Sequence, residues 1–192
     1  MTYRHVALLG RARSGKDTVA GRLVQRYQFT RLAFADEVRR AALDLDPIVG
    51  AQPFGMATLP IRLSDVVNRY GWERSKTEYP EVRRTLQQLG ESVRQGDPDY
   101  WLRIVRARVE TAMGWSLPVV VSDVRYRNEL AALRRWGFLV VRVDRPGAGA
   151  GGDAENHVSE TELNGAPVDV TIPNSGSLED LYALADTLAV RR

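Results

Sequence analysis

The chain contains no cysteine and only two histidines, His5 and His157, among its 192 residues. The lack of cysteine excludes disulfides, thiolate metal sites and cysteine nucleophiles, and two histidines are too few for a multi-histidine metal site. No apolar run approaches the roughly 20 residues of a membrane span, and the apolar run at the N-terminus is too short for a secretion signal. We therefore expect a cytoplasmic protein that has no membrane partner.

Lysine is almost missing as well. Lys16 and Lys76 are the two lysines, and the other 25 of the 27 basic residues are arginines. The net charge is only +3, which points weakly to polyanions. Arginine forks suit bidentate binding of phosphate, but a coding bias toward arginine would give the same composition, so both explanations stay open.

Apolar runs and amphipathic segments alternate along the chain in the order strand, helix, strand. This pattern predicts an α/β fold in which helices cover both faces of a parallel sheet. The expected strands are 5–9, 29–34, 119–121, 138–143 and 168–172. Residues 46–60 carry three prolines and two glycines, which predicts a long loop.

The chain length fits a single domain, 1–192, in which we distinguish three parts. The five strands form a core of residues 1–35, 116–145 and 167–192. A largely helical insertion follows the second strand, and we expect its residues, 36–115, to bind an acceptor. The glycine-rich segment 146–166 is expected to be a lid.

Residues 10–18, GRARSGKDT, match the spacing G-x4-G-K between a strand and a helix. The glycines let successive N–H groups point at a phosphate, and the N-terminus of the following helix adds partial positive charge. Lys16 would reach the β- and γ-phosphates of ATP. The residues of the loop expected to bind ATP are Arg11, Ala12, Arg13, Ser14, Gly15, Lys16, Asp17 and Thr18.

Two aspartates are candidate ligands of Mg²⁺. Asp17 stands where serine or threonine is usual, and a carboxylate can bind Mg²⁺ directly or through water; stabilisation of the helix dipole is an equally good explanation. Asp123 ends an apolar strand, where P-loop proteins place a second acid, although a turn aspartate is the alternative. Two residues later, Arg125 could neutralise the transferring phosphoryl group.

The acceptor side should lie in the insertion, because an acceptor nucleotide needs fixed arginines for its phosphate and amide or aromatic contacts for its base. Arg145, His157 and Glu160 are candidate lid residues, with Arg145 toward ATP and the other two toward the acceptor. The acceptor candidates in the insertion are Asp36, Arg39, Arg83, Arg84, Gln88 and Trp101.

The chain resembles the bacteriophage deoxynucleoside monophosphate kinases. The matching segments are GRARSGKDTVA, LAFADEVRRAA, GWERSKTEYPEVRRTLQQLGESVR, DPDYW, VVVSDVRYRNEL, HVSETEL and IPNSGSLEDL, and the combination of GKDT with DVR-x-x-NE is the specific part. The resemblance implies a P-loop kinase fold with strand order 2-3-1-4-5 and Mg·ATP as the phosphoryl donor. By position it also places the acceptor at Asp36 and the 83–88 helix, phosphate neutralisation at Arg125, and the adenine near Asn174 and Gly176.

We therefore expect an enzyme that transfers the γ-phosphoryl group of Mg·ATP to a deoxynucleoside monophosphate (dNMP), with Lys16, Arg125 and Asp36 as catalytic residues. If a phage encodes it, its compartment is the host cytoplasm. The alternatives are a kinase of another small acceptor, such as dephospho-coenzyme A, and an ATP-gated nucleic-acid-binding protein. A stable nucleic acid complex is not expected, because the arginines are interspersed with acids, and a homodimer is compatible with the sequence.

Overall fold

The structure is a computed structural model that describes residues 3–149 and 161–191. His157 and Glu160 lie outside the described residues. The chain divides into two compact units, which are described separately. Met1–Phe34 together with Leu102–Arg192 form the sheet unit, and Ala35–Trp101 form the helical unit.

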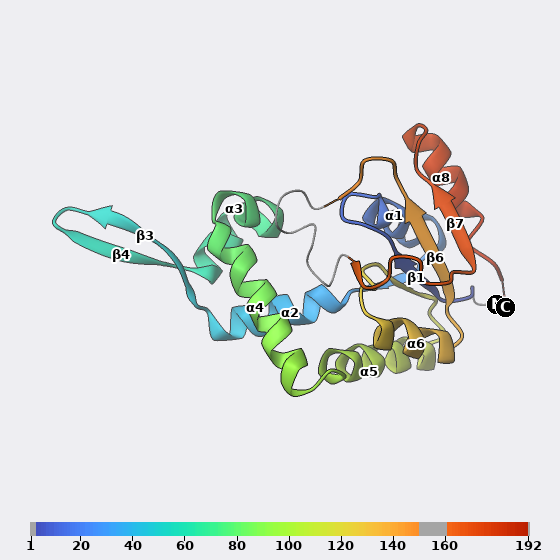
Figure 1. The fold of residues 1–192 in the computed structure, drawn as a ribbon, viewed down its shortest axis with the longest axis horizontal. Coiled ribbons are helices and arrows are strands. Elements are labelled where there is room, and N and C mark those ends of the chain that lie inside the picture. The colour runs from blue at the N-terminus through green and yellow to red at the C-terminus, as the bar shows by residue number, and fades with distance from the viewer. Residues whose placement is uncertain (1–2, 150–160, 192) are drawn as a thin grey trace. The chain divides into compact units, whose positions relative to one another are not determined.

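A five-stranded parallel sheet is the centre of the sheet unit (Figure 1). Its spatial order is β2-β5-β1-β6-β7. Counted along the chain, these strands are the second, third, first, fourth and fifth of the sheet, so the predicted order 2-3-1-4-5 is confirmed. The strands are β1 (Val6–Leu9), β2 (Thr30–Leu32), β5 (Val119–Val121), β6 (Leu139–Asp144) and β7 (Val170–Pro173).

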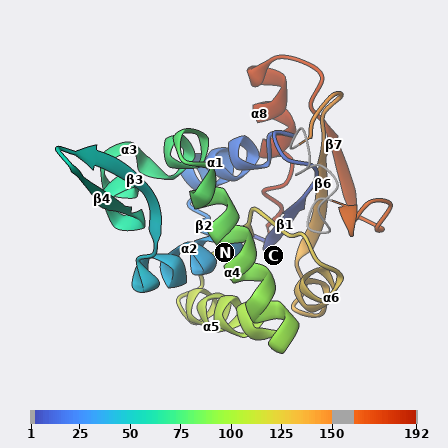
Figure 2. The ribbon, with the colours of Figure 1, turned by 60° about the vertical axis from the view of Figure 1, so that its left-hand side comes forward.

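The central strands are buried on both faces, as expected for a parallel sheet covered by helices. All four residues of β1 are at most 1% exposed, and β5 is fully buried. On one face, α1 (Lys16–Tyr27) and α8 (Leu178–Asp186) pack against β1 and β6 through Val19, Leu23 and Leu181. Figures 1 and 2 show α5 (Tyr100–Gly114) and α6 (Arg127–Arg135) on the opposite face.

The helical unit contains α2 (Phe34–Leu45) from its second residue onward, α3 (Leu63–Glu78) and α4 (Pro80–Gly96). Its core is the buried cluster Ala42, Val49, Leu63, Val66 and Val82. Within α3, Gly71 has φ 70° and ψ 167°, so the chain kinks there. Only glycine adopts this left-handed conformation without strain. Most of α5, which we expected in the acceptor insertion, belongs to the sheet unit.

The prediction of a loop over 46–60 is wrong, because β3 (Ile48–Phe54) and β4 (Ala57–Arg62) form an antiparallel hairpin. Gly55 and Met56 make its turn, and Gly55 has φ 59°, as a type II′ turn requires. The closing pair is Phe54–Ala57, so the alternation of the ladder puts Pro53 and Pro60 in non-hydrogen-bonded pairs. Neither proline therefore removes a ladder hydrogen bond, and proline is tolerated in such strands.

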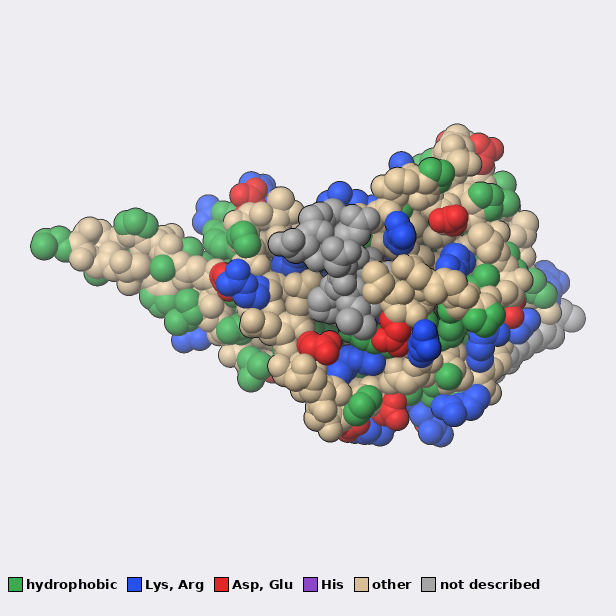
Figure 3. Space-filling model, in the orientation of Figure 1, with side chains coloured by type: hydrophobic (Ala, Val, Ile, Leu, Met, Phe, Trp, Pro, Cys, Tyr) green, Lys and Arg blue, Asp and Glu red, His purple; other side chains and the backbone are tan. Residues whose placement is uncertain are grey.

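The hairpin lies largely exposed. Residues 48–61 include no charged side chain, and Phe54, Met56 and Ile48 are among the most exposed large apolar residues. Figure 3 shows hydrophobic side chains along it. No helix within residues 3–149 and 161–191 is long and apolar enough to cross a membrane.

Candidate active site

The loop between β1 and α1 has the backbone of a phosphate-binding loop. Gly10, Arg13 and Gly15 all have positive φ, of 141°, 62° and 103°. A Cβ on Gly10 would lie 2.3 Å from the carbonyl oxygen of Val143, and one on Gly15 would lie 2.5 Å from Nδ2 of Asn174. Neither glycine can be replaced without displacing these neighbours. Since Gly15 is the residue just before α1, the loop ends at the N-terminus of a helix, where anions are stabilised.

Lys16 is the first residue of α1, and its side chain turns back over the loop. Its ammonium donates to the carbonyl oxygens of Gly10 and Arg11, at 2.7 Å each, and the residue is only 9% exposed. A buried ammonium is costly unless it is bound. The carbonyls hold the charge at the mouth of the loop, where a phosphate would be its strongest partner.

The hydroxyl of Ser14 is buried and has no hydrogen-bond partner in the described part of the chain. Ser14 is 1% exposed and lies between the two glycines of the loop. A buried hydroxyl without a partner costs about 1–3 kcal/mol, so native structures seldom keep one without a reason. A phosphate oxygen bound in the loop would supply the missing acceptor, and in this respect the loop fits the triphosphate of ATP.

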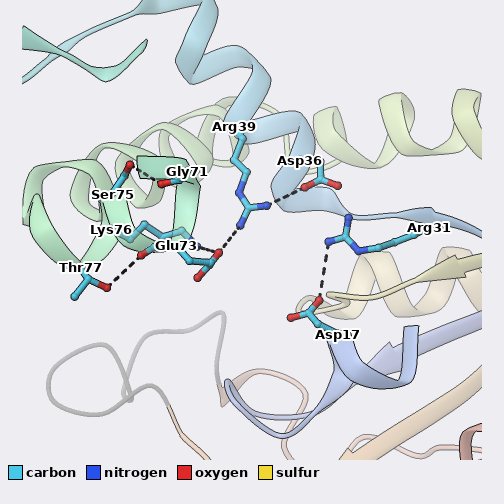
Figure 4. Close-up of polar contacts among 9 residues, drawn as sticks. All are labelled: Asp17, Arg31, Asp36, Arg39, Gly71, Glu73, Ser75, Lys76 and Thr77. Atoms are coloured by element: carbon cyan, nitrogen blue, oxygen red, sulfur yellow. Dashed lines mark hydrogen bonds and ion pairs between the residues drawn. The ribbon is translucent and has the colours of Figure 1, made fainter. Parts of the chain in front are cut away.

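The ends of the parallel strands bring further polar residues to the same edge of the sheet. After β5, the carboxylate of Asp123 accepts a hydrogen bond from the N–H of Phe34 at 2.8 Å. Beyond β1, Asp17 is 86% exposed and lies 4.0 Å from the guanidinium of Arg31 (Figure 4). Arg145 follows β6 directly and is exposed.

Magnesium fits these residues only as an ion held largely by the nucleotide and water. The described residues contain no group of three or more histidine, cysteine, aspartate or glutamate side chains that could enclose a metal. Mg²⁺ is usually bound by one or two carboxylates together with phosphates and water. Asp17 and Asp123 could supply these one or two carboxylates.

Glu129 organises the segment that carries Arg125. Its buried carboxylate accepts the backbone N–H groups of Arg125 at 2.9 Å and Tyr126 at 3.1 Å. This holds the turn between β5 and α6 in one conformation. The backbone of Arg125 is therefore fixed, and its side chain is half-buried.

In the helical unit, a network of charges surrounds Arg39. Its guanidinium donates to Asp36 at 3.0 Å and to Glu73 at 3.3 Å (Figure 4). The guanidinium carbon also lies 5.5 Å from the ring centre of Trp72. Lys76 donates to Glu73 at 2.7 Å. This hydrogen bond lowers the pKa of Glu73, and the charges of Arg39 and Arg83 act in the same direction. The Nε of Arg39 is buried and has no hydrogen-bond partner in the described part of the chain.

The sequence profile of the deoxynucleotide monophosphate kinases matches residues 61–184, more than half of the chain. The chain belongs to the deoxynucleotide monophosphate kinase family. Since the matched region begins after the phosphate-binding loop, that loop is an independent indication that the chain binds a nucleotide phosphate. The family transfers a phosphoryl group from ATP to a deoxynucleoside monophosphate, so its members are phosphotransferases.

Viral proteins provide the relatives of this kinase. It is 26% identical over 202 residues to a protein of Acanthamoeba polyphaga mimivirus whose name assigns it provisionally to the same family, with 93% of this chain and 92% of the relative covered. It is 30% identical to the deoxynucleotide monophosphate kinase of Enterobacteria phage T4, over 67% of this chain and 52% of that protein. The corresponding enzyme of Escherichia phage RB69 is 31% identical, over 53% of this chain and 42% of that protein. The alignment thus spans about half of the length of the two phage enzymes.

Four further predicted residues of this kinase lie in three different surroundings. Asn174 lies against the phosphate-binding loop, because its Nδ2 donates to the carbonyl oxygen of Ser14 at 2.8 Å. Arg84 pairs with Glu81 on the exposed face of α4, and Gln88 is also exposed. Trp101 is 4% exposed and its indole N–H donates to the carbonyl oxygen of Gly90, a geometry that favours packing over contact with an acceptor.

Sequence reasoning missed Glu73, Lys76 and Glu129. Lys76 carried a signal, because it is the second of two lysines in a chain rich in arginine and stands three residues after Glu73, the spacing of a helical ion pair. Glu129 follows Tyr126 by three residues, the spacing at which a glutamate can accept a backbone N–H at the start of a helix.

Proposed function

We propose that this kinase transfers the γ-phosphoryl group of Mg·ATP to a deoxynucleoside monophosphate, giving ADP and the deoxynucleoside diphosphate. The observation that carries the donor half of the proposal is the phosphate-binding loop, with its buried lysine and with a Ser14 hydroxyl that has no hydrogen-bond partner among the described residues. Family membership supports the acceptor half. We retain the cytoplasm as the proposed location.

An oxygen of the acceptor phosphate attacks the γ-phosphorus, and the bond between that phosphorus and the β,γ-bridging oxygen breaks as ADP leaves. A phosphate monoester is already largely ionised at neutral pH, since its second pKa is about 6. No general base is therefore required, and catalysis comes from positioning and electrostatics. In this scheme Lys16 and the loop N–H groups hold the β- and γ-phosphates, and Arg125 compensates negative charge on the transferring group.

Mg²⁺ would be held beside the phosphates by Asp17 and Asp123, and it would neutralise charge on the β- and γ-oxygens. Arg31, 4.0 Å from Asp17, keeps the latter carboxylate near a positive charge until the ion arrives. On Asp123, the hydrogen bond from Phe34 fixes the orientation of the carboxylate.

The acceptor is assigned to the helical unit, with Arg39 as its central residue. Arginine binds a phosphate or the polar edge of a base through a planar fork. Asp36 and Glu73 each accept a hydrogen bond from this fork, and its central carbon lies over the ring of Trp72. We therefore propose that Asp36 acts by orienting Arg39, and that Arg83 adds positive charge nearby.

The test is a substrate panel. The purified chain is incubated with Mg·ATP and each dNMP, each ribonucleoside monophosphate or dephospho-coenzyme A, and ADP release is measured. We expect ADP and the matching diphosphate with at least one dNMP. Turnover with dephospho-coenzyme A alone, or ATP-dependent DNA binding without acceptor phosphorylation, would replace the proposal with one of the alternatives.

A variant pair separates the phosphate-binding loop from general charge effects. Lys16→Ala should abolish transfer while the fold stays intact, because the loop loses the ammonium that would follow the γ-phosphate. Arg106→Ala removes one exposed positive charge that pairs with Glu110, and its turnover should match that of the unmodified chain. Full turnover in Lys16→Ala would contradict the assignment.

A further inference from the structure

The loop after β7 is joined to the phosphate-binding loop through a single side chain. Asn174 is the first residue after β7, and its backbone N–H donates to the carbonyl oxygen of Asp144 at 2.6 Å, which continues the pairing of β6 with β7. Its side-chain Nδ2 donates to the carbonyl oxygen of Ser14 at 2.8 Å, across 160 positions of sequence. The backbone of Asn174 is thus part of the sheet, while its amide holds the loop.

This hydrogen bond fixes the peptide plane between Ser14 and Gly15. In a planar trans peptide the C=O and the N–H point in opposite directions. A carbonyl of Ser14 held outward by Asn174 therefore leaves the N–H of Gly15 pointing to the other side of the loop. Amides of this kind are the groups that bind phosphate oxygens in such loops.

The contact leaves little freedom for this peptide to turn. Nδ2 of Asn174 lies 2.5 Å from the position of a Cβ on Gly15, and Cδ2 of Leu181 lies 3.4 Å from it. Gly15 is thus needed for the close approach of Asn174 as well as for its own φ of 103°. Without the amide, the Ser14–Gly15 peptide would lose the hydrogen bond that holds its carbonyl.

The loop after β7 is itself held in place. Ser177 caps α8: its hydroxyl accepts the N–H of Asp180, and its own N–H donates to the Asp180 carboxylate. The backbone hydrogen bond from Ser177 lowers the pKa of Asp180, and its hydroxyl acts in the same direction. Farther along, Asp186 accepts two hydrogen bonds of 2.7 Å from Arg22 of α1. Both ends of α8 are therefore anchored, and Figure 2 shows α8 beside α1.

We propose that Asn174 is a positioning residue that holds the Ser14–Gly15 peptide in its phosphate-binding orientation. This goes beyond the sequence-based expectation, which placed Asn174 near the adenine. It rests on the proposed use of ATP. The role predicts that Asn174 affects the binding of the phosphates alone, without any nucleoside.

The experiment compares two ligands that share a diphosphate and differ in the nucleoside: Mg·ADP and Mg·pyrophosphate, both titrated by calorimetry. Asn174→Ala should weaken the affinity for each ligand by the same factor, about five- to tenfold, the scale of one hydrogen bond. Asn174→Asp should weaken both further, because a carboxylate has no proton for the Ser14 carbonyl. Ser175→Asp puts the same charge on the next, exposed residue and should have a smaller effect than Asn174→Asp.

A stability control separates positioning from folding. Asp186→Asn weakens the anchor between α8 and α1 at the far end of α8. It should lower the melting temperature and reduce pyrophosphate affinity less than Asn174→Ala does. If Asn174→Ala does not fold, Asn174→Ser takes its place, since the serine hydroxyl is too short to reach the Ser14 carbonyl.

Two results would overturn the proposal: wild-type affinity for pyrophosphate in Asn174→Ala, or a loss confined to ADP, which would make Asn174 an adenine contact. If the unmodified chain bound neither ligand, the proposed use of ATP itself would fall. The two failures are therefore distinguishable.

Discussion

Replacing Ser14 with alanine should weaken nucleotide binding without reducing the stability of the fold. In the absence of nucleotide, the buried hydroxyl has no partner among the described residues. Folding therefore removes it from water without compensation, at a cost of about 1–3 kcal/mol. Ser14→Ala removes this cost, and the free energy of unfolding should stay unchanged or rise by about 1 kcal/mol.

The effect on binding follows from the same hydroxyl. A hydrogen bond to a charged group contributes about 1.5–3 kcal/mol, which corresponds to roughly 10- to 150-fold in the dissociation constant. The dissociation constant of Mg·ADP should therefore be at least about tenfold higher for Ser14→Ala than for the unmodified chain. Stability is measured by urea unfolding without nucleotide, and affinity by titration calorimetry.

Ser177→Ala is the matched control, because its hydroxyl is already hydrogen-bonded to Asp180. Loss of this N-cap should reduce the unfolding free energy by about 1 kcal/mol and lower ADP affinity much less than Ser14→Ala does. If Ser14→Ala instead lost stability and kept full affinity, its hydroxyl would serve the fold, and the assignment of that atom to a phosphate would be refuted.

Two further predictions concern the helical unit and the α1–α8 contact. Arg39→Lys keeps the positive charge but loses the planar fork that Asp36 holds. Steady-state kinetics should show a KM for dNMP raised about tenfold, the scale of one charge-assisted hydrogen bond, and an unchanged KM for ATP. Equal changes in the two KM values would contradict the assignment of Arg39 to the acceptor. The hydrogen bond from Arg22 lowers the pKa of Asp186 in the folded protein. The pair therefore stabilises the fold fully above the ordinary aspartate pKa of about 3.9, and this contribution is lost as the pH falls from that value through the lowered pKa of Asp186. Urea unfolding should therefore show a difference between the unmodified chain and Asp186→Asn at pH 7 that shrinks at pH 3, and a difference independent of pH would argue against a charge-based contact.

The sheet and the phosphate-binding loop could be predicted because their signals are local. Strand β5 reads as three valines, and β1 as four apolar residues followed directly by Gly10. Burial on both faces produces such runs, and the loop motif lies within a single stretch of nine residues. The strand order came from the resemblance, since pairing between distant strands leaves no local mark.

The hairpin and the contacts of Asn174 could not be predicted in the same way. Pro53 and Pro60 suggest a loop until the register shows that they fall in non-hydrogen-bonded pairs. The amide of Asn174 reaches Ser14 only because β6 and β7 bring the two segments to one edge of the sheet. Both features depend on pairing between separate strands, which periodicity within one segment does not report.

The scarcity of lysine gives this protein a simple amine chemistry. Apart from the α-amino group, the primary amines of the chain are Lys16 and Lys76, and each is hydrogen-bonded in the structure. An amine-selective acylating reagent would therefore modify very few sites, and the modified peptides could be assigned without ambiguity. The rate of acylation at Lys16 would then report occupancy of the phosphate-binding loop, with Lys76 as an internal reference in the same molecule.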